Sequence, residues 1–388
     1  MTAAAFLLLS AGFFPSSLNA ETLTIEVSSV VAGVTQVQGF HLGAAQSNPP
    51  PSVFLVSALK PRFWRFDDDG LSGFAPSYSF IRQFSPKMTW IIAGGYTHNK
   101  GIGFDQLNCQ TLDMSDWIRY ATTTVQLGLA LSPPISYYDV FNEPDWVLQC
   151  PQNLRVSALE TLYIQTYNAV KSAAPSAKLV GPSWSYYDFA AIRRFLDLQI
   201  ANNLHYDAIS WHELGSSPQE VVAHVAEVRA YIQANAGFFC QTACPEIHVN
   251  EYKSPHQNLM PSFAVGWLAS LEQAKVDAAS RACWDDYDSY SGPRYSNCSL
   301  GLNGLLRQDN VNPRSLYWVH RAYADLQGLT RVRVVSDSTD PNSTAVNAIA
   351  SRNDALQEVK ILLGRYSCGA NGAFCGAGRN TVDQAQDS

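Results

Sequence analysis

The chain has 388 residues, 46% of them hydrophobic and 12% aromatic, so it can bury a large core and is not an intrinsically disordered protein. Its net charge at pH 7 is -7. It has no run of Lys or Arg that would neutralise phosphates or anionic lipids, which argues against nucleic acid and membrane surfaces as partners.

Residues 1–20 predict a secretory signal peptide. The segment from Ala3 to Phe14 is apolar but too short to span a bilayer, and Ala20 offers a small residue for cleavage. No Lys or Arg precedes Lys60, so the basic region that usually opens a signal is missing. A buried N-terminal strand or helix is the alternative interpretation. We expect a secreted, extracellular protein.

Eight cysteines, an even number, fit an oxidising compartment and disulfide bonds. Their positions favour the pairs Cys240 with Cys244, Cys283 with Cys298, Cys368 with Cys375, and Cys109 with Cys150. A metal site is the weaker interpretation, because no Cys-x-x-Cys pair or His-rich cluster accompanies them. Two N-glycosylation sequons begin at Asn297 and Asn342, and the first would be a poor acceptor if Cys298 is disulfide-bonded.

Alternating strands and helices are predicted across residues 36–328. The predicted strands are residues 40–42, 63–67, 90–93, 138–143, 178–181, 208–212, 247–251 and 282–284. Apolar residues at helical spacing, such as Leu159, Tyr163 and Val170, predict helices between them, with others over residues 263–275 and 314–326. Eight such units in roughly 250 to 300 residues predict an α/β fold, a (β/α)8 TIM barrel.

A small accessory β domain is predicted outside the barrel, over residues 329–388. Residues 331–335, 345–350 and 359–363 are short strand-like runs separated by turn residues, with no helix between them. The N-terminal segment, residues 21–35, carries a strand in which Leu23, Ile25 and Val27 alternate with polar residues, and it is expected to join this domain. Residues 369–388 are glycine-rich and polar, and are expected to form a loose end.

Two strand-end glutamates stand out. An apolar and aromatic run ends in Asn142-Glu143-Pro144, and because Pro144 cannot donate to a ladder, Glu143 is predicted at the tip of the fourth strand. Residues 245–252 repeat this design, with Glu251 ending the seventh strand. In a TIM barrel both tips lie at the active-site face, and retaining glycosidases need two carboxyl groups about 5 to 5.5 Å apart. A solvated strand-end carboxylate is the alternative for either glutamate alone.

The segments Val140-Phe141-Asn142-Glu143-Pro144 and Val249-Asn250-Glu251-Tyr252 resemble the acid/base and nucleophile motifs of clan A retaining glycoside hydrolases. Within that clan, residues 36–326 are similar to glycoside hydrolase family 39, the xylosidase and iduronidase family. The cue is residues 207–212, which resemble that family's sixth strand ending in Ser-x-His.

The resemblance implies that Glu143 is the acid/base and Glu251 the nucleophile. It also implies that Asn142 binds the sugar 2-hydroxyl and that His212 lines the sugar pocket. The family commonly has a tyrosine two residues after that histidine, whereas this chain has Leu214, and we consider Tyr252 and Tyr96 as substitutes.

Three further residues are candidates for substrate binding or support. Arg65, near the tip of the second strand, would hold the nucleophile ionised, with a structural ion pair as the alternative. Asp67 would bind hydroxyls, with a solvated acidic loop as the alternative. Trp284, on the predicted eighth strand, would be a stacking floor for a sugar ring.

The predicted function is a secreted retaining glycoside hydrolase that acts on an oligo- or polysaccharide by double displacement, with no cofactor and no metal. The chain has no phosphate-binding Gly-x-x-x-x-Gly-Lys and no His-Glu-x-x-His motif. A catalytically inactive glycan-binding barrel and a transglycosylase are the alternatives. The sugar, exo or endo action and the oligomeric state stay open.

Overall fold

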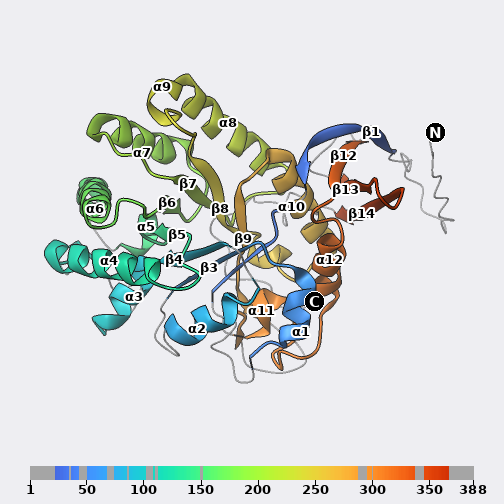
Figure 1. Cartoon of the computed structure of the whole chain (residues 1–388), viewed down its shortest axis with the longest axis horizontal. Helices are drawn as coiled ribbons and strands as arrows, with labels where there is room; N and C mark the ends of the chain where they lie inside the picture. The colour runs from blue at the N-terminus through green and yellow to red at the C-terminus, as the bar shows by residue number, and fades with distance from the viewer. Residues whose placement is uncertain are drawn as a thin grey trace.

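The computed structural model describes residues 22–34, 36–42, 50–67, 74–84, 87–101, 108–109, 112–148, 152–286, 295–298, 300–336 and 345–366. Eight parallel strands form a closed barrel at its centre (Figure 1). They are β2 (Gly39–His41), β3 (Phe63–Asp67), β4 (Lys87–Ile91), β5 (Tyr137–Asp139), β6 (Leu179–Trp184), β7 (Ala208–Glu213), β8 (Glu246–Tyr252) and β9 (Ala278–Arg281). The predicted TIM barrel is confirmed.

Helices surround the strands (Figure 1). They are α1 (Val53–Leu59), α2 (Phe74–Ile81), α3 (Ile92–Asn99), α4 (Met114–Leu129), α5 (Pro144–Val147), α6 (Gln152–Ala173), α7 (Phe189–Asn202), α8 (Glu220–Ala234), α9 (Ala236–Phe239), α10 (Pro261–Ala274), α11 (Gly301–Gly304) and α12 (Ser315–Ala324), with a 3-10 turn, η3 (Pro255–Gln257), and a short hairpin of β10 (Asp285–Asp286) and β11 (Tyr295–Ser296).

Local sequence explains how these helices start and which face they bury. Asp113 caps α4 by accepting hydrogen bonds from the backbone N–H groups of Ser115 and Asp116, which lack partners within the helix. Behind that cap, Trp117 and Val125 belong to the buried face of α4. The cap and the apolar stripe together fix α4 against its neighbours in the helical layer.

Four barrel strands differ from the predicted bounds by more than one residue at an end, and β6 is one of them, because it runs to Trp184 and not to Gly181. The third strand ends at Ile91, where α3 follows at once, and the fourth ends at Asp139, four residues before Glu143. The eighth strand is β9, residues 278–281, and not residues 282–284. Its Ala-Ala-Ser-Arg sequence has weak β propensity, but pairing with β8 on one side and β2 on the other decides its place.

An antiparallel sheet lies beside α10 and α12, in the order β1-β12-β13-β14 (Figure 1). Its strands are β1 (Leu23–Val34), β12 (Thr330–Ser336), β13 (Ala345–Asn353) and β14 (Glu358–Tyr366). The prediction that the N-terminal strand joins the C-terminal strands is therefore confirmed. The sheet docks closely on α10, since a Cβ at Gly266 would lie 2.5 Å from the Tyr366 ring and one at Gly364 2.7 Å from Val265.

Disulfide bonds join Cys240 to Cys244 and Cys283 to Cys298, as predicted. Cys109 is also disulfide-bonded, while Cys150, Cys368 and Cys375 lie outside the described residues. Asn297, which begins one sequon, is buried, and its side-chain oxygen accepts from the Trp284 backbone, so it is not accessible for glycosylation in the folded chain. The other sequon and the predicted signal and tail lie outside the described residues.

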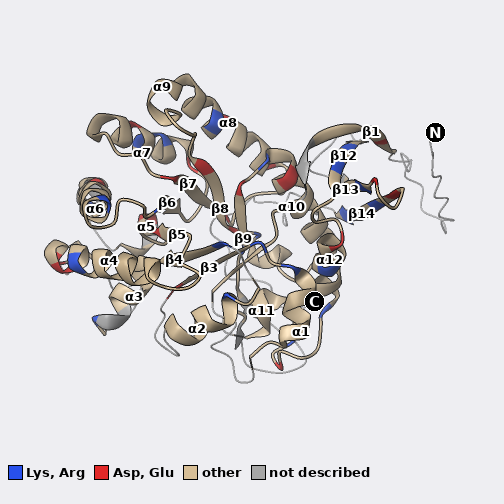
Figure 2. Ribbon diagram, in the orientation of Figure 1, with Lys and Arg blue, Asp and Glu red and all other residues tan. Residues whose placement is uncertain are grey.

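Charged residues are dispersed over the described elements in the ribbon view, and most of the chain carries no charge (Figure 2). In the part of the chain that the structure describes, we find no helix with both the length and the apolarity needed to cross a bilayer.

Candidate active site

Glu143 lies at the junction between the fourth strand and α5. The strand-like pairing continues past β5, because the Val140 backbone N–H donates to Val180 and that of Glu143 donates to Ser183. Pro144 then begins the short helix α5, and Glu143 itself adopts a left-handed backbone with φ 49°. Such a conformation is uncommon for a residue with a side chain and marks a constrained position.

Glu251 lies inside β8, at its second-last position, and a bulge determines where it points. Trp211 of β7 pairs with Val249, but the next residue, His212, pairs with Glu251, so Asn250 has no partner in the register. A bulge of this kind re-aims side chains, and both Asn250 and Glu251 make contacts inside the barrel.

The two glutamates meet at the mouth of the barrel. Oxygen atoms of Glu143 and Glu251 and a nitrogen of His212 all lie within 4.8 Å of one another. His212 Nδ1 lies 3.0 Å from Oε1 of Glu143 and 3.8 Å from Oε1 of Glu251. The imidazole of His212 therefore lies against both carboxylates. That His212 lines a sugar pocket stays a prediction.

Arg65 connects the nucleophile candidate to the rest of the site. Its Nη1 donates to Glu251 Oε1 at 3.0 Å, its Nη2 to Asn142 Oδ1 at 2.6 Å, and its Nε to Asp139 Oδ2 at 2.8 Å. The side chains of Arg65 and Asp139 are fully buried. A guanidinium whose donors are all used in this way has one orientation, so Arg65 holds Glu251 and Asn142 in fixed positions.

A buried polar layer lies beneath the glutamates. Asp139 Oδ1 accepts from Ser183 Oγ at 2.7 Å, and Asp139 Oδ2 accepts from Asn250 Nδ2 at 2.8 Å. Ser183 Oγ also lies 2.7 Å from Ser210 Oγ. Asp139, Ser183, Ser210 and Asn250 belong to β5, β6, β7 and β8. Their hydrogen bonds therefore connect four neighbouring strands directly beneath the glutamates and make this part of the barrel rigid.

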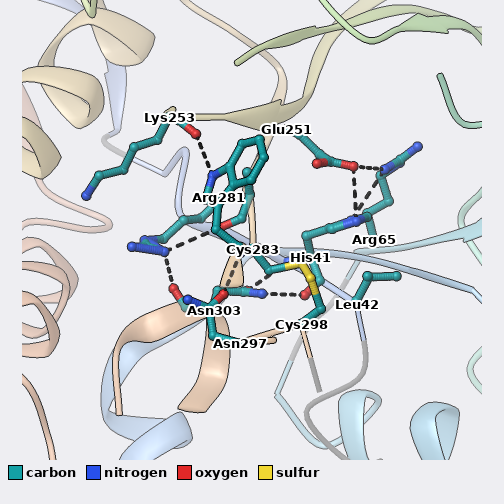
Figure 3. Close-up of a disulfide and its surroundings, with 12 residues drawn as sticks. His41, Leu42, Arg65, Glu251, Lys253, Arg281, Cys283, Asn297, Cys298 and Asn303 are labelled. Atoms are coloured by element: carbon teal, nitrogen blue, oxygen red, sulfur yellow. Dashed lines mark hydrogen bonds and ion pairs between the residues drawn. A yellow bond between two sulfur atoms is a disulfide. The ribbon is translucent and has the colours of Figure 1, made fainter. Parts of the chain in front are cut away.

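His41 is a further contact of Glu251, contributed by β2. Its Nε2 lies 3.1 Å from Glu251 Oε1, and its Nδ1 lies 3.3 Å from Arg65 Nη1. Since Arg65 can only donate, Nδ1 is the acceptor and the proton sits on Nε2, which donates to Glu251. The backbone of His41 is held in turn by Asn303, whose Oδ1 accepts from His41 N and whose Nδ2 donates to His41 O (Figure 3).

Burial and charge set the protonation of these groups. Burial raises the pKa of Glu251, and the nearby Glu143 carboxylate raises it further, while His212 and Arg65 act in the opposite direction. Burial, Arg65 and His212 lower the pKa of His41 well below its usual value, so His41 is neutral at neutral pH. Glu251 thus receives hydrogen bonds from the neutral imidazole of His41 and from the cationic guanidinium of Arg65.

The trio of Glu143, His212 and Glu251 has the donor atoms of a metal site. However, the Arg65 guanidinium already bonds the Glu251 oxygen that lies closest to His212. A cation bound there would face this fixed positive charge, so the donor set fits acid–base chemistry better than metal binding.

The other predicted site residues lie elsewhere. Tyr252 is buried, and its ring packs against Trp267 of α10 at 5.5 Å, because the bulge turns Glu251 inward and Tyr252 outward. Tyr96 lies on α3, buried against Trp117 and Tyr120 of α4. Neither tyrosine is placed to replace the family's tyrosine beside Glu251.

Trp284 and Asp67 are near the rim of the barrel. Trp284 follows β9 by three residues, and its indole N–H donates to the Lys253 carbonyl at 2.9 Å, which fixes the ring at the end of β8. Asp67 ends β3, and its carboxylate packs against α3, since a Cβ at Gly94 would lie 2.6 Å from Asp67 Oδ2. Nothing in these contacts joins either side chain to the two glutamates.

Sequence reasoning missed His41, Asp139 and Asn250 as site residues. The predicted strands over residues 40–42, 138–143 and 247–251 include all three residues, but no role was predicted for them. The available signal was polarity at inward positions of apolar strands, because a polar side chain that is fully buried needs a partner.

Comparisons with known proteins identify relatives of this chain. No family model matches the chain. Over 209 residues, 53% of this chain, it is 28% identical to a 3-O-alpha-D-galactosyl-alpha-L-arabinofuranosidase of Bifidobacterium longum subsp. longum. Over 204 residues it is 24% identical to a 3-O-beta-L-arabinopyranosyl-alpha-L-arabinofuranosidase of Bifidobacterium pseudocatenulatum. The matched regions span 16% and 18% of these two proteins.

Solved structures share the fold. Protein N2152 of Neocallimastix frontalis matches with a TM-score of 0.69 at 20% identity, over 87% of this chain and 79% of that one. A monomeric beta-xylosidase of Caulobacter crescentus CB15 matches with a TM-score of 0.59 at 15% identity, over 85% of this chain and 74% of that one. The GH39 enzyme of Xanthomonas axonopodis pv. citri matches with a TM-score of 0.56 at 16% identity, over 88% of this chain and 76% of that one. The predicted similarity to family 39 is confirmed at the level of the fold.

Proposed function

We propose that this chain is a retaining glycoside hydrolase in which Glu251 is the nucleophile and Glu143 the acid/base. The observation that carries the proposal is the approach of the two carboxylates, whose oxygens lie within 4.8 Å of each other at the barrel mouth. Retaining enzymes hold their carboxyl groups about 5 to 5.5 Å apart, whereas inverting enzymes need room for a water between them.

In the first step, an oxygen of Glu251 attacks the anomeric carbon as the bond to the leaving oxygen breaks. Glu143 gives its proton to that oxygen, so the leaving group departs as a neutral alcohol. In the second step, Glu143 takes a proton from water, the water oxygen attacks the anomeric carbon, and the bond to Glu251 breaks. The sugar leaves with its original anomeric configuration and Glu143 is protonated again.

The surrounding residues prepare Glu251 for attack. Arg65 and His41 both donate to Glu251 Oε1, which stabilises the carboxylate form against the effect of burial. Asn142 is held by Arg65 through its side-chain oxygen, which leaves its N–H₂ group to donate to a sugar hydroxyl. His212 lies against Glu143 and fixes that side chain beside the reacting bond.

The relatives support a proposal for the substrate class. The names of both sequence relatives end in alpha-L-arabinofuranosidase. We therefore propose alpha-L-arabinofuranosides of oligo- or polysaccharides as the first substrates to examine, with beta-D-xylosides second because of the xylosidases that share the fold.

Hydrolysis of 4-nitrophenyl alpha-L-arabinofuranoside and of a panel of other aryl glycosides tests the proposal, with NMR detection of the anomer formed first. We expect the retained anomer, and no turnover by Glu251→Ala. The inverted anomer would overturn the retaining mechanism. Glycan binding without hydrolysis across the panel would favour an inactive barrel, and sugar-transfer products would favour a transglycosylase.

We also propose that the protein is exported. The support is the presence of disulfide bonds at Cys240–Cys244 and Cys283–Cys298, which persist in oxidising compartments. N-terminal sequencing of protein from the native host's medium should begin after Ala20, and recovery of full-length protein inside the cell would contradict export.

A further inference from the structure

Residues 301–304 form a buried left-handed turn outside the barrel strands. The φ angles of these four consecutive residues are 70°, 49°, 53° and 79°, and the two in the middle, Leu302 and Asn303, carry side chains. Glycine adopts this conformation freely, so Gly301 and Gly304 fit it, but Leu302 and Asn303 have to be held in it by their surroundings. Strain of this kind clusters at functional sites, and here it fixes the direction of the Asn303 side chain.

Backbone contacts fix this turn against β9, the strand that closes the barrel beside β2. The Asn303 carbonyl accepts from Arg281 of β9, and the Asn303 N–H donates to the Asn297 carbonyl at 3.2 Å. Asn297 precedes Cys298, and the disulfide bond from Cys298 to Cys283 ties this segment to the residues that follow β9. The position of Asn303 is therefore set by the end of β9.

The Asn303 side chain takes the place of a strand partner for His41. In the described part of the chain β2 pairs with β9 at one position, Phe40 with Arg281. The Leu42 N–H donates to β3, so the N–H and C=O of His41 point to the opposite side, toward β9. Asn303 Oδ1 accepts from His41 N–H at 3.1 Å, and Asn303 Nδ2 donates to the His41 carbonyl at 2.8 Å (Figure 3). The amide thus does what the peptide groups of a longer β9 would do.

Three contacts of Glu251 fall on the same carboxylate oxygen, Oε1. They are His41 Nε2 at 3.1 Å, Arg65 Nη1 at 3.0 Å and His212 Nδ1 at 3.8 Å. Because Oε1 accepts hydrogen bonds from His41 and Arg65, Oε2 is the oxygen left to attack the anomeric carbon. Loss of the His41 contact would let the carboxylate rotate, and Oε2 would leave the line of attack that the reaction requires.

We propose that Asn303 is a positioning residue for the nucleophile: its amide holds the backbone of His41, and His41 holds Glu251 with Oε2 free to attack. This inference rests on the proposed function and adds to it a residue that makes no contact with the reacting atoms. Asparagine meets both requirements of the position, because it adopts left-handed backbone more readily than most residues and carries a donor and an acceptor on one planar group.

Asn303→Gly tests the role of the amide, because glycine keeps the left-handed backbone and its contacts but removes the side chain. We expect kcat on 4-nitrophenyl alpha-L-arabinofuranoside to fall by about 10-fold or more, with KM changed by under about 3-fold, since the amide orients the nucleophile and does not bind the sugar. Asn203→Gly is the matched control. Asn203 has φ 53° as well, but it is exposed at the end of α7, and its replacement should leave kcat and KM unchanged.

A double-mutant cycle with His41→Ala separates positioning from a general loss of stability. If Asn303 acts through His41, Asn303→Gly should lower kcat by under about 2-fold in a chain that already carries His41→Ala. A turn with a merely structural role would lower kcat by the same factor in both backgrounds. That outcome would overturn the proposal.

Crystal structures of the wild type and of Asn303→Gly test the positioning without any measurement of activity. We expect the distance from His41 Nε2 to Glu251 Oε1, which is 3.1 Å here, to exceed about 3.5 Å in the variant. An unchanged contact would contradict the inference, whereas a wild type that hydrolyses no glycoside would contradict the proposed function alone. If Asn303→Gly does not fold, Asn303→Asp replaces it with the same expected results, because an ionised carboxylate of the same shape cannot donate to the His41 carbonyl.

Discussion

Arg65 and Glu251 meet at 3.0 Å although 186 positions separate them in the chain. They come from the second and seventh strands of the barrel, and closure of the sheet brings them together. Arg65 also bonds Asp139 and Asn142, so one guanidinium sets the positions of three side chains of the site. This relationship determines how the activity should depend on pH.

Replacing Arg65 should move the acid limb of the pH profile. Burial raises the pKa of Glu251 and Arg65 opposes that effect, so Arg65→Gln should raise this pKa further. Below its pKa Glu251 is protonated and cannot attack, and the acid limb of kcat/KM should therefore shift upward by about one pH unit or more. Arg82→Gln, at an exposed arginine, should leave the limb unchanged. An unshifted limb in Arg65→Gln would show that Arg65 does not control ionisation of Glu251.

Replacing the nucleophile should abolish hydrolysis in a way that azide can repair. Glu251→Ala should lower kcat by roughly 10⁴-fold or more, because no glycosyl-enzyme can form. Added azide should enter the space of the lost carboxylate and give a glycosyl azide of inverted configuration, identified by NMR. Glu227→Ala, at an exposed glutamate, is the control. A retained azide product would assign the nucleophile to another residue.

Replacing the acid/base should spare substrates that need no proton. Glu143→Ala should still react with dinitrophenyl glycosides, whose leaving groups depart as anions, and the glycosyl-enzyme on Glu251 should accumulate and be visible by mass spectrometry. Azide should then give a product of retained configuration. Equal losses of activity on dinitrophenyl and alkyl glycosides would argue against the acid role of Glu143.

Removing Asp139 should destabilise the barrel. Asp139→Ala takes from Arg65 a fully buried partner and leaves Asn250 and Ser183 without their shared acceptor, so the free energy of unfolding should fall by about 3 kcal/mol or more in urea titrations. Asp325→Ala breaks a more exposed pair with Arg321 and should cost under about 1 kcal/mol. Equal small losses would mean that the polar layer is not a unit.

Peptide mapping without reduction tests the predicted cysteine pairs. We expect peptides that join Cys240 to Cys244 and Cys283 to Cys298, as in the structure, together with Cys109 joined to Cys150 and Cys368 to Cys375. Free thiols at several of these positions in protein recovered from the medium would contradict the oxidising compartment.

Local sequence patterns were enough to predict the barrel, the accessory sheet and the two strand-end glutamates. Alternation of strands and helices predicted the barrel, and the apolar runs that end at Glu143 and Glu251 predicted which residues would gather at its mouth. The accessory sheet was predicted from short alternating runs. These features follow from periodicity and propensity, which depend on neighbours in the chain.

The tertiary structure decided which way the site residues point. A bulge between β7 and β8 turned Glu251 inward and Tyr252 outward, and the pairing of β9 with β8 and β2 overrode the weak propensity of residues 278–281. His41 and Arg65 gained their roles only when strand closure brought them to Glu251. Register shifts and contacts between distant strands depend on how the whole sheet closes, and a local pattern does not contain that information.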